Sequence, residues 1–75
     1  MVKIRNLEPT RQKAAYSCLR AYLEGKQNLN WFLEMIQYYG AHGAVLSRAF
    51  DQLRQYDDLD RYREAKAACE GLGWI

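Results

Sequence analysis

Apolar side chains recur every three or four residues along most of the chain, and glycines stand where this pattern breaks. The spacing matches the 3.6-residue turn of an α-helix. Gly25, Gly40 and Gly71 follow apolar stretches, at positions where helices commonly end. No strand-like segment beyond the first residues is available to pair into a sheet. The sequence therefore predicts an all-α fold, a small bundle of four helices in one domain.

The helix boundaries are expected at residues that favour helix ends. Pro9 suits a first turn, where its missing N–H is not needed. Asn28 and the pair Asp57 and Asp58 have side chains that cap helix starts, and Leu72 is expected to fold back on the last turn. Within a domain spanning residues 1–75, helices are predicted at 9–24, 29–39, 43–55 and 58–70. The residues expected to face the core are Ala15, Cys18, Leu19, Tyr22, Leu23, Leu29, Phe32, Leu33, Ile36, Val45, Leu46, Ala49, Phe50, Leu53, Leu59, Tyr62, Ala65 and Cys69.

The residues before the first helix alternate in polarity. Val2 and Ile4 would point one way, and Lys3 and Arg5 the other. We expect residues 1–8 to form a short extended arm that packs across a helix groove or pairs with another molecule.

Composition narrows the class of protein. No apolar run is long enough to span a bilayer, and the N-terminus lacks a signal-peptide core, so we expect a soluble, cytoplasmic protein without membrane contact. The two cysteines, Cys18 and Cys69, lack metal-binding spacing. Free buried thiols are the favoured interpretation, and a Cys18–Cys69 bridge stays open. No cofactor or metal is expected.

Catalytic chemistry has little support in the sequence. Nucleophilic catalysis needs a base beside a serine or cysteine, and His42, the only histidine, falls in a glycine-rich turn. There is no glycine-rich phosphate-binding motif. A domain of 75 residues also has little volume for a substrate cavity. We therefore expect a protein that is not an enzyme.

A second apolar stripe on residues 29–39 is the most suggestive functional feature. Trp31, Met35 and Tyr38 follow one another at helical spacing, outside the face that the core requires, and Trp74 is a possible neighbour. These residue types are enriched at protein interfaces. The stripe is either core or a binding surface for a partner protein or for a second copy in a homodimer. Basic residues on the outer side of 9–24 (Arg11, Lys13, Arg20) could steer an acidic partner.

Residues 32–50 resemble a generic helix-turn-helix, because a helix ends at Gly40 and a second helix follows a short turn. On that hypothesis the arm would enter the minor groove of DNA and the second helix the major groove. The residues placed at DNA are Lys3, Arg5, His42, Ala44, Ser47, Arg48 and Gln52. Against it, Ile36 is bulky for a close helix crossing, Asp51 would face DNA, and residues 28–56 carry no net charge.

The sequence therefore favours a small non-enzymatic regulatory protein that binds and modulates or inhibits a larger protein through an aromatic helix face. Its size and aromatic content are typical of small bacterial or phage regulators, which is an analogy and not a motif match. The alternative is a small helix-turn-helix transcriptional regulator that binds DNA.

Overall fold

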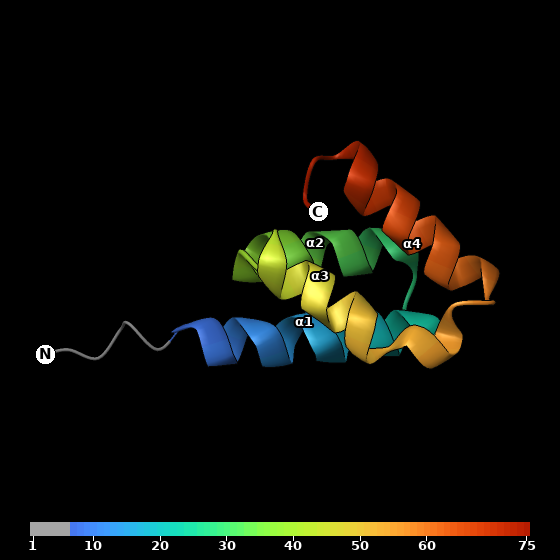
Figure 1. Ribbon diagram of the computed structural model, residues 1–75, viewed down its shortest axis with the longest axis horizontal. Helices are drawn as coiled ribbons and strands as arrows, with labels where there is room; N and C mark the ends of the chain where they lie inside the picture. Colours follow the sequence, from blue (N-terminus) through green and yellow to red (C-terminus); the bar gives the residue numbers. More distant parts are fainter. Residues whose placement is uncertain (1–6) are drawn as a thin grey trace, which may run out of the picture.

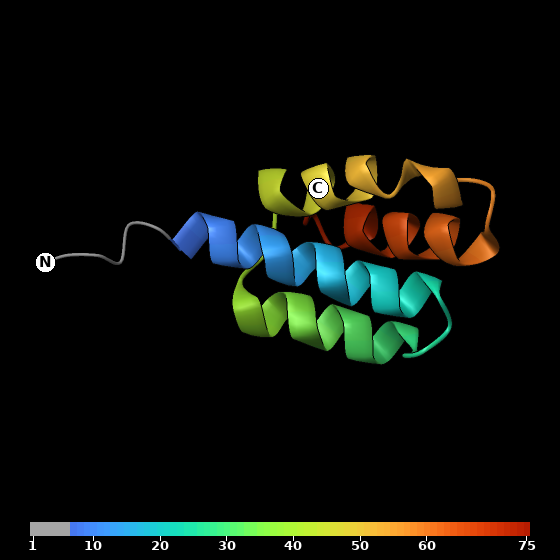
Figure 2. The same cartoon turned by 90° about the horizontal axis from the view of Figure 1, so that it is seen from below.

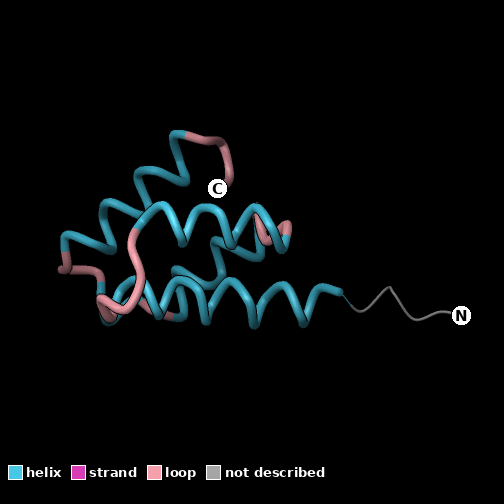
Figure 3. Tube along the Cα trace, turned by 180° about the vertical axis from the view of Figure 1, so that it is seen from behind, coloured by secondary structure: helices cyan, strands magenta, loops and turns pink. Residues whose placement is uncertain are grey.

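A computed structural model describes residues 7–75, and this part of the chain is helical with no strand (Figure 1; Figure 3). The predicted all-α, four-helix fold is confirmed. No described helix is both long and apolar enough to cross a membrane. Lys3, Arg5 and the rest of residues 1–6 of the predicted arm lie outside the described residues. The elements are α1 (Leu7–Leu23), α2 (Leu29–Tyr39), α3 (Ala44–Gln52), the short 3₁₀ helix η2 (Arg54–Tyr56) and α4 (Asp60–Gly71).

Helix α1 is the central element of the bundle. It lies beneath α2 and α3 (Figure 1) and runs along the seam between them in the view from below (Figure 2), and it packs most closely against those two helices. Helix α4 lies on the side of α2 and α3 that faces away from α1 (Figure 1). It also contacts the second half of α1. Helix α2 packs mainly against α1, so part of its surface is not covered by another helix.

Four aromatic rings join the four helices at the centre of the core. Phe32 of α2 stacks on Tyr22 of α1, with ring centroids 5.8 Å apart, and meets Phe50 of α3 edge to face at 6.5 Å. Tyr62 of α4 packs edge to face on Phe50 at 5.4 Å, and its hydroxyl donates a hydrogen bond to the Phe50 carbonyl at 2.9 Å. Edge-to-face and offset pairs add to the stabilisation from burial. Phe32 is fully buried at this junction.

Glycines in the left-handed conformation end three helices. After α2, Gly40 donates to the Gln37 carbonyl, and Ala41 donates to the Ile36 carbonyl. The same pair of bonds follows α1 at Gly25 and α4 at Gly73. This pattern satisfies carbonyls that a helix end leaves without partners, and the left-handed φ favours glycine. The predicted stops after 24 and 39 are therefore confirmed to within one residue.

Helix α4 is held at both of its ends. Near its start, Arg61 donates to the carbonyls of Tyr22 and Gln27, at 2.9 and 3.3 Å, and its guanidinium lies 4.9 Å from the centroid of the Tyr22 ring. After its end, the chain folds back so that the Gly43 N–H donates to the Trp74 carbonyl. These contacts tie α4 to the end of α1 and to the α2–α3 turn.

The predicted start of the first helix and the predicted end of the third helix are each wrong by two or three residues. Helix α1 begins at Leu7, so Leu7 and Glu8 belong to the helix and not to an arm. Pro9 still lies in the first turn, where no intrahelical N–H bond is needed. Helix α3 ends at Gln52 and continues only as η2, because Leu53 leaves the α-helical conformation at φ −108° and ψ 29°.

The start and exit of α4 also differ from expectation. The helix begins at Asp60 with Leu59 in the N-cap position, so neither Asp57 nor Asp58 caps it. The cause is a tight turn after η2, in which the Leu59 N–H donates to the Tyr56 carbonyl. Leu59, predicted to be core, is 44% exposed. Leu72, predicted to fold back, is 53% exposed, because Trp74 returns to the helix instead.

Most of the predicted core is buried. The confirmed residues are Ala15, Cys18, Leu19, Tyr22, Leu23, Phe32, Ile36, Val45, Leu46, Ala49, Phe50, Leu53, Tyr62, Ala65 and Cys69. Leu29 and Leu33 are only half-buried. Asn28 caps α2 as predicted, and its side chain accepts a hydrogen bond from the Trp31 N–H at 2.8 Å.

Replacing Gly43 by alanine should lower the free energy of unfolding by about 1–3 kcal/mol. Gly43 has φ 68° and ψ −133°, a region that residues with a Cβ rarely adopt. A Cβ there would meet no atom within 4 Å, so the backbone alone sets the effect. Gly71→Ala is the matched control, since its Cβ also enters open space but its backbone is helical. Urea denaturation should show Gly71→Ala unchanged or stabilised by up to about 1 kcal/mol. Equal effects at the two glycines would contradict this explanation.

Candidate functional site

A shallow groove of about 350 Å³ runs between α1 and α2. It is mainly apolar. Its lining residues are Thr10, Lys13, Ala14, Ser17 and Cys18 from α1, and Trp31, Met35 and Tyr39 from α2. Two of the predicted binding residues, Trp31 and Met35, therefore lie together in one concave surface.

The groove exists because small residues face large ones across it. On α1, Thr10, Ala14 and Cys18 recur every four residues, and on α2 the positions 31, 35 and 39 do the same. Residues four apart lie on one face of a helix. A wall of small side chains beside a wall of large ones leaves a hollow along the seam, and closer packing of α1 and α2 would be needed to fill it.

The three residues of the predicted stripe differ in burial: two pack against the core and one is exposed. Trp31 and Met35 are half-buried and pack against the core from its edge. Tyr38 is 78% exposed and meets the Tyr39 ring edge to face, with centroids 5.1 Å apart. The stripe is thus neither fully core nor fully free.

Trp74 lies apart from this groove. Its ring packs on His42, with centroids 4.6 Å apart, beside the α2–α3 turn, and it is not among the residues that line the groove. The sequence reasoning placed it near the stripe because a segment that follows the last helix has no periodicity to position it. The α1 wall of the groove was not predicted, because small residues spaced four apart, such as Thr10, Ala14 and Cys18, do not by themselves indicate a binding surface.

Lys13 is the one charged residue among the described residues that line the groove. It is exposed, and no other described side chain, within residues 10–75, forms an ion pair with it. An ammonium group on the rim of an apolar hollow favours an anionic group in its vicinity.

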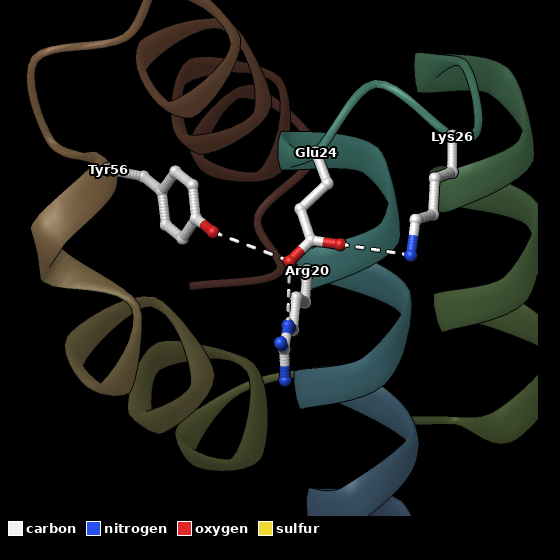
Figure 4. A network of polar contacts seen from close by, with 4 residues as sticks. All are labelled: Arg20, Glu24, Lys26 and Tyr56. Atoms are coloured by element: carbon white, nitrogen blue, oxygen red, sulfur yellow. Dashed lines mark hydrogen bonds and ion pairs between the residues drawn. The ribbon is translucent and has the colours of Figure 1, made fainter.

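Arg20, the next basic residue on this side of α1, is already paired (Figure 4). Its Nε donates a hydrogen bond to the Glu24 carboxylate at 2.8 Å. The same carboxylate forms an ion pair with Lys26 Nζ at 3.2 Å and accepts a hydrogen bond from the Tyr56 hydroxyl at 3.5 Å. The hydrogen bond from Arg20, followed by that from Lys26, holds the pKa of the Glu24 carboxyl below its ordinary value. The positive charge left unpaired beside the groove is therefore that of Lys13.

Of the described residues predicted to contact DNA, four lie on the exposed side of α3 and His42 lies in the turn before it. Ser47, Arg48 and Gln52 are exposed on α3, but Arg48 Nη1 donates to Gln12 Oε1 of α1 at 3.0 Å. His42 is half-buried, and its Nε2 is buried without a hydrogen-bond partner among the described residues. Ala44 is exposed at the start of α3. Asp51 shares the exposed surface of α3, which therefore carries one positive and one negative charge.

The two cysteines are free thiols, and burial raises the pKa of both. Cys69 is fully buried and its pKa rises to about 12. Cys18 forms part of the groove floor but is only 6% exposed. A thiol with a raised pKa is a poor nucleophile near neutral pH. No three metal-binding side chains gather anywhere in the described part of the chain.

Comparisons with protein-family models, with curated proteins and with solved structures gave no match for this chain.

Proposed function

We propose that this chain is a small regulatory protein that binds a larger protein through the α1/α2 groove and modulates or inhibits it. The observation that carries the proposal is the open apolar seam between α1 and α2, which is lined by the half-buried Trp31 and Met35 and by Tyr39. Tyr38 is exposed, and its ring meets that of Tyr39. Tryptophan and tyrosine are enriched among the residues that dominate binding energy at protein interfaces, and methionine is enriched at interfaces in general.

The chemistry of the groove supports binding over catalysis. Among the described residues, its lining contains no carboxylate and no imidazole, and burial raises the pKa of its one thiol. A general acid or base would need such a group within reach of a substrate. The lining thus suits recognition of an apolar surface.

DNA binding through α3 is the weaker alternative. The exposed face of α3 has balanced charge, and Arg48 is bound to Gln12. Since neutralisation of phosphates supplies most of the affinity for DNA, a neutral helix is poorly suited to it. In addition, α2 and α3 pack chiefly on α1, which runs along the seam between them (Figure 2), whereas the helices of a helix-turn-helix pack on each other.

Alanine substitution in the groove should weaken partner binding at least about tenfold while leaving the helices intact. Affinity capture with the tagged protein would isolate the partner, and calorimetry would compare the original chain with Trp31→Ala and Tyr39→Ala. Tyr39 is the last residue of α2 and is 39% exposed, so its removal should leave the helices intact, which circular dichroism can verify. Leu72→Ala is the matched control, because Leu72 is an exposed apolar residue that does not line the groove.

Two results would count against the proposal. One is a partner that binds both groove variants and the original chain equally well. The other is a complex with duplex DNA that weakens steeply as salt is added, because that behaviour is typical of phosphate contacts.

A further inference from the structure

We infer that the α1/α2 groove accepts one amphipathic α-helix of the partner, with apolar residues at i, i+4 and i+7 and an acidic residue beside that stripe. The acidic residue would pair with Lys13. This inference rests on the proposed function and specifies the chemistry of the segment that is bound.

The dimensions of the groove fit a helix. Its walls repeat every four residues, at positions 10, 14 and 18 of α1 and at 31, 35 and 39 of α2. Four residues rise about 6 Å along a helix, so successive apolar side chains of a third helix would meet successive rows of the groove. Helices bound in grooves use this i, i+4, i+7 set of anchors.

The polarity of the walls favours a helix over an extended peptide. Both walls are helices, whose backbone groups along the groove are used within α1 and α2. An extended segment would bring a row of N–H and C=O groups that need partners. The described lining offers them only a few side-chain groups, on Thr10, Lys13 and Ser17 and at the polar tips of Trp31 and Tyr39. A helix satisfies its own backbone and presents only side chains.

The positive charge of Lys13 favours a bound helix that carries an acidic residue beside its apolar stripe. Lys13 is exposed and unpaired among the described side chains, whereas the neighbouring Arg20 is held in an ion pair with Glu24. An acidic residue next to the apolar stripe would lie near the Lys13 ammonium, and a basic residue would be repelled by it.

A second copy of this chain fits the groove less well. The exposed faces of α3 and α4 are polar and offer no apolar stripe. The remaining choice is groove against groove, and two concave surfaces would leave both hollows unfilled, which costs the contacts that drive association.

Synthetic peptides test the inference directly. The first is a 15-residue alanine- and glutamine-based helix with leucines at i, i+4 and i+7 and a glutamate beside them, and the second has lysine in place of that glutamate. The third has the first peptide's composition with the leucines scattered around the helix. Amide chemical shifts of the full chain, followed during titration, should move at residues 10–18 and 31–39 with the first peptide and stay unchanged with the third.

A charge exchange provides the decisive comparison. The glutamate peptide should bind the original chain about two- to fivefold more tightly than the lysine peptide, and Lys13→Glu should reverse that order. Lys66→Glu is the control, because it makes the same charge change on α4, outside the groove, and should preserve the order.

Several outcomes would overturn the inference. One is that neither leucine-stripe peptide binds, or that the scattered peptide binds equally well. Another is that Lys13→Glu does not reverse the order of the two peptides. A third is that the groove shifts depend on protein concentration alone, which would reveal binding of a second copy. If the natural partner still loses affinity on Trp31→Ala, the proposed function stands without this inference. If it does not, both fail.

Discussion

Replacing Phe32 by alanine should lower the free energy of unfolding by about 3–5 kcal/mol. Phe32 is fully buried and its ring contacts both Tyr22 and Phe50, so its removal leaves a cavity at the junction of the four helices. A 75-residue domain has a total stability of roughly 4–11 kcal/mol. The loss would therefore remove a large share of the stability, and urea denaturation followed by circular dichroism would measure it.

The neighbouring residue provides the control. Trp31 is half-buried at the edge of the core, so Trp31→Ala should cost clearly less than Phe32→Ala although tryptophan is the larger side chain. A loss at Trp31 equal to that at Phe32 would show that the stripe belongs to the core and would remove the main support for a binding groove.

Raising the pH above 9 should destabilise the domain, at a rate of up to about 1.4 kcal/mol per pH unit from Cys69 alone. The pKa of this thiol rises from 9.0 to about 12 in the folded protein, mainly because burial penalises the thiolate. Between these two values the unfolded chain releases the proton and the folded chain retains it, so unfolding becomes easier as the pH rises. Below pH 9 this group contributes no pH dependence. Urea midpoints measured from pH 7 to 11 would show the decline.

Variants separate the contributions to this alkaline unfolding. Cys69→Ala should flatten the profile above pH 9, while Cys18→Ala should alter it less, because Cys18 sits at the groove and not in the deepest core. Burial also raises the pKa of Tyr22 and Tyr62 from 10.0, which adds destabilisation of the same sign at the upper end of the range. A Cys69→Ala profile as steep as that of the original chain would refute the assignment.

Periodicity was enough to predict the helices and most of the core. The positions of Leu19, Phe50 and Tyr62 follow from helical spacing alone, because an apolar face must be buried. Leu59 and Leu72 were misplaced because they lie at the ends of α4, where the hydrogen bonds of adjacent turns decide which way a side chain points. Such bonds depend on the local backbone path, which periodicity does not specify.

Only half of the candidate site could be predicted from the sequence. Trp31 and Met35 stand out because large apolar residues occupy positions that one ordinary core face does not need. The opposite wall of small residues, including Ala14 and Cys18, is typical of any helix. The sequence did not indicate that α1 is the central helix, so the partner of α2 across the groove was not predictable.

The attachment of α4 at both ends has a consequence for how the domain comes apart. Arg61 donates to one carbonyl in the last turn of α1 and to one beyond its end, and the Trp74 carbonyl accepts from the Gly43 N–H in the α2–α3 turn. Shedding α4 would release both anchors together and uncover Phe50 where Tyr62 now covers it. We therefore expect the loss of α4 to break these contacts in one step and to weaken the packing of the three helices before it.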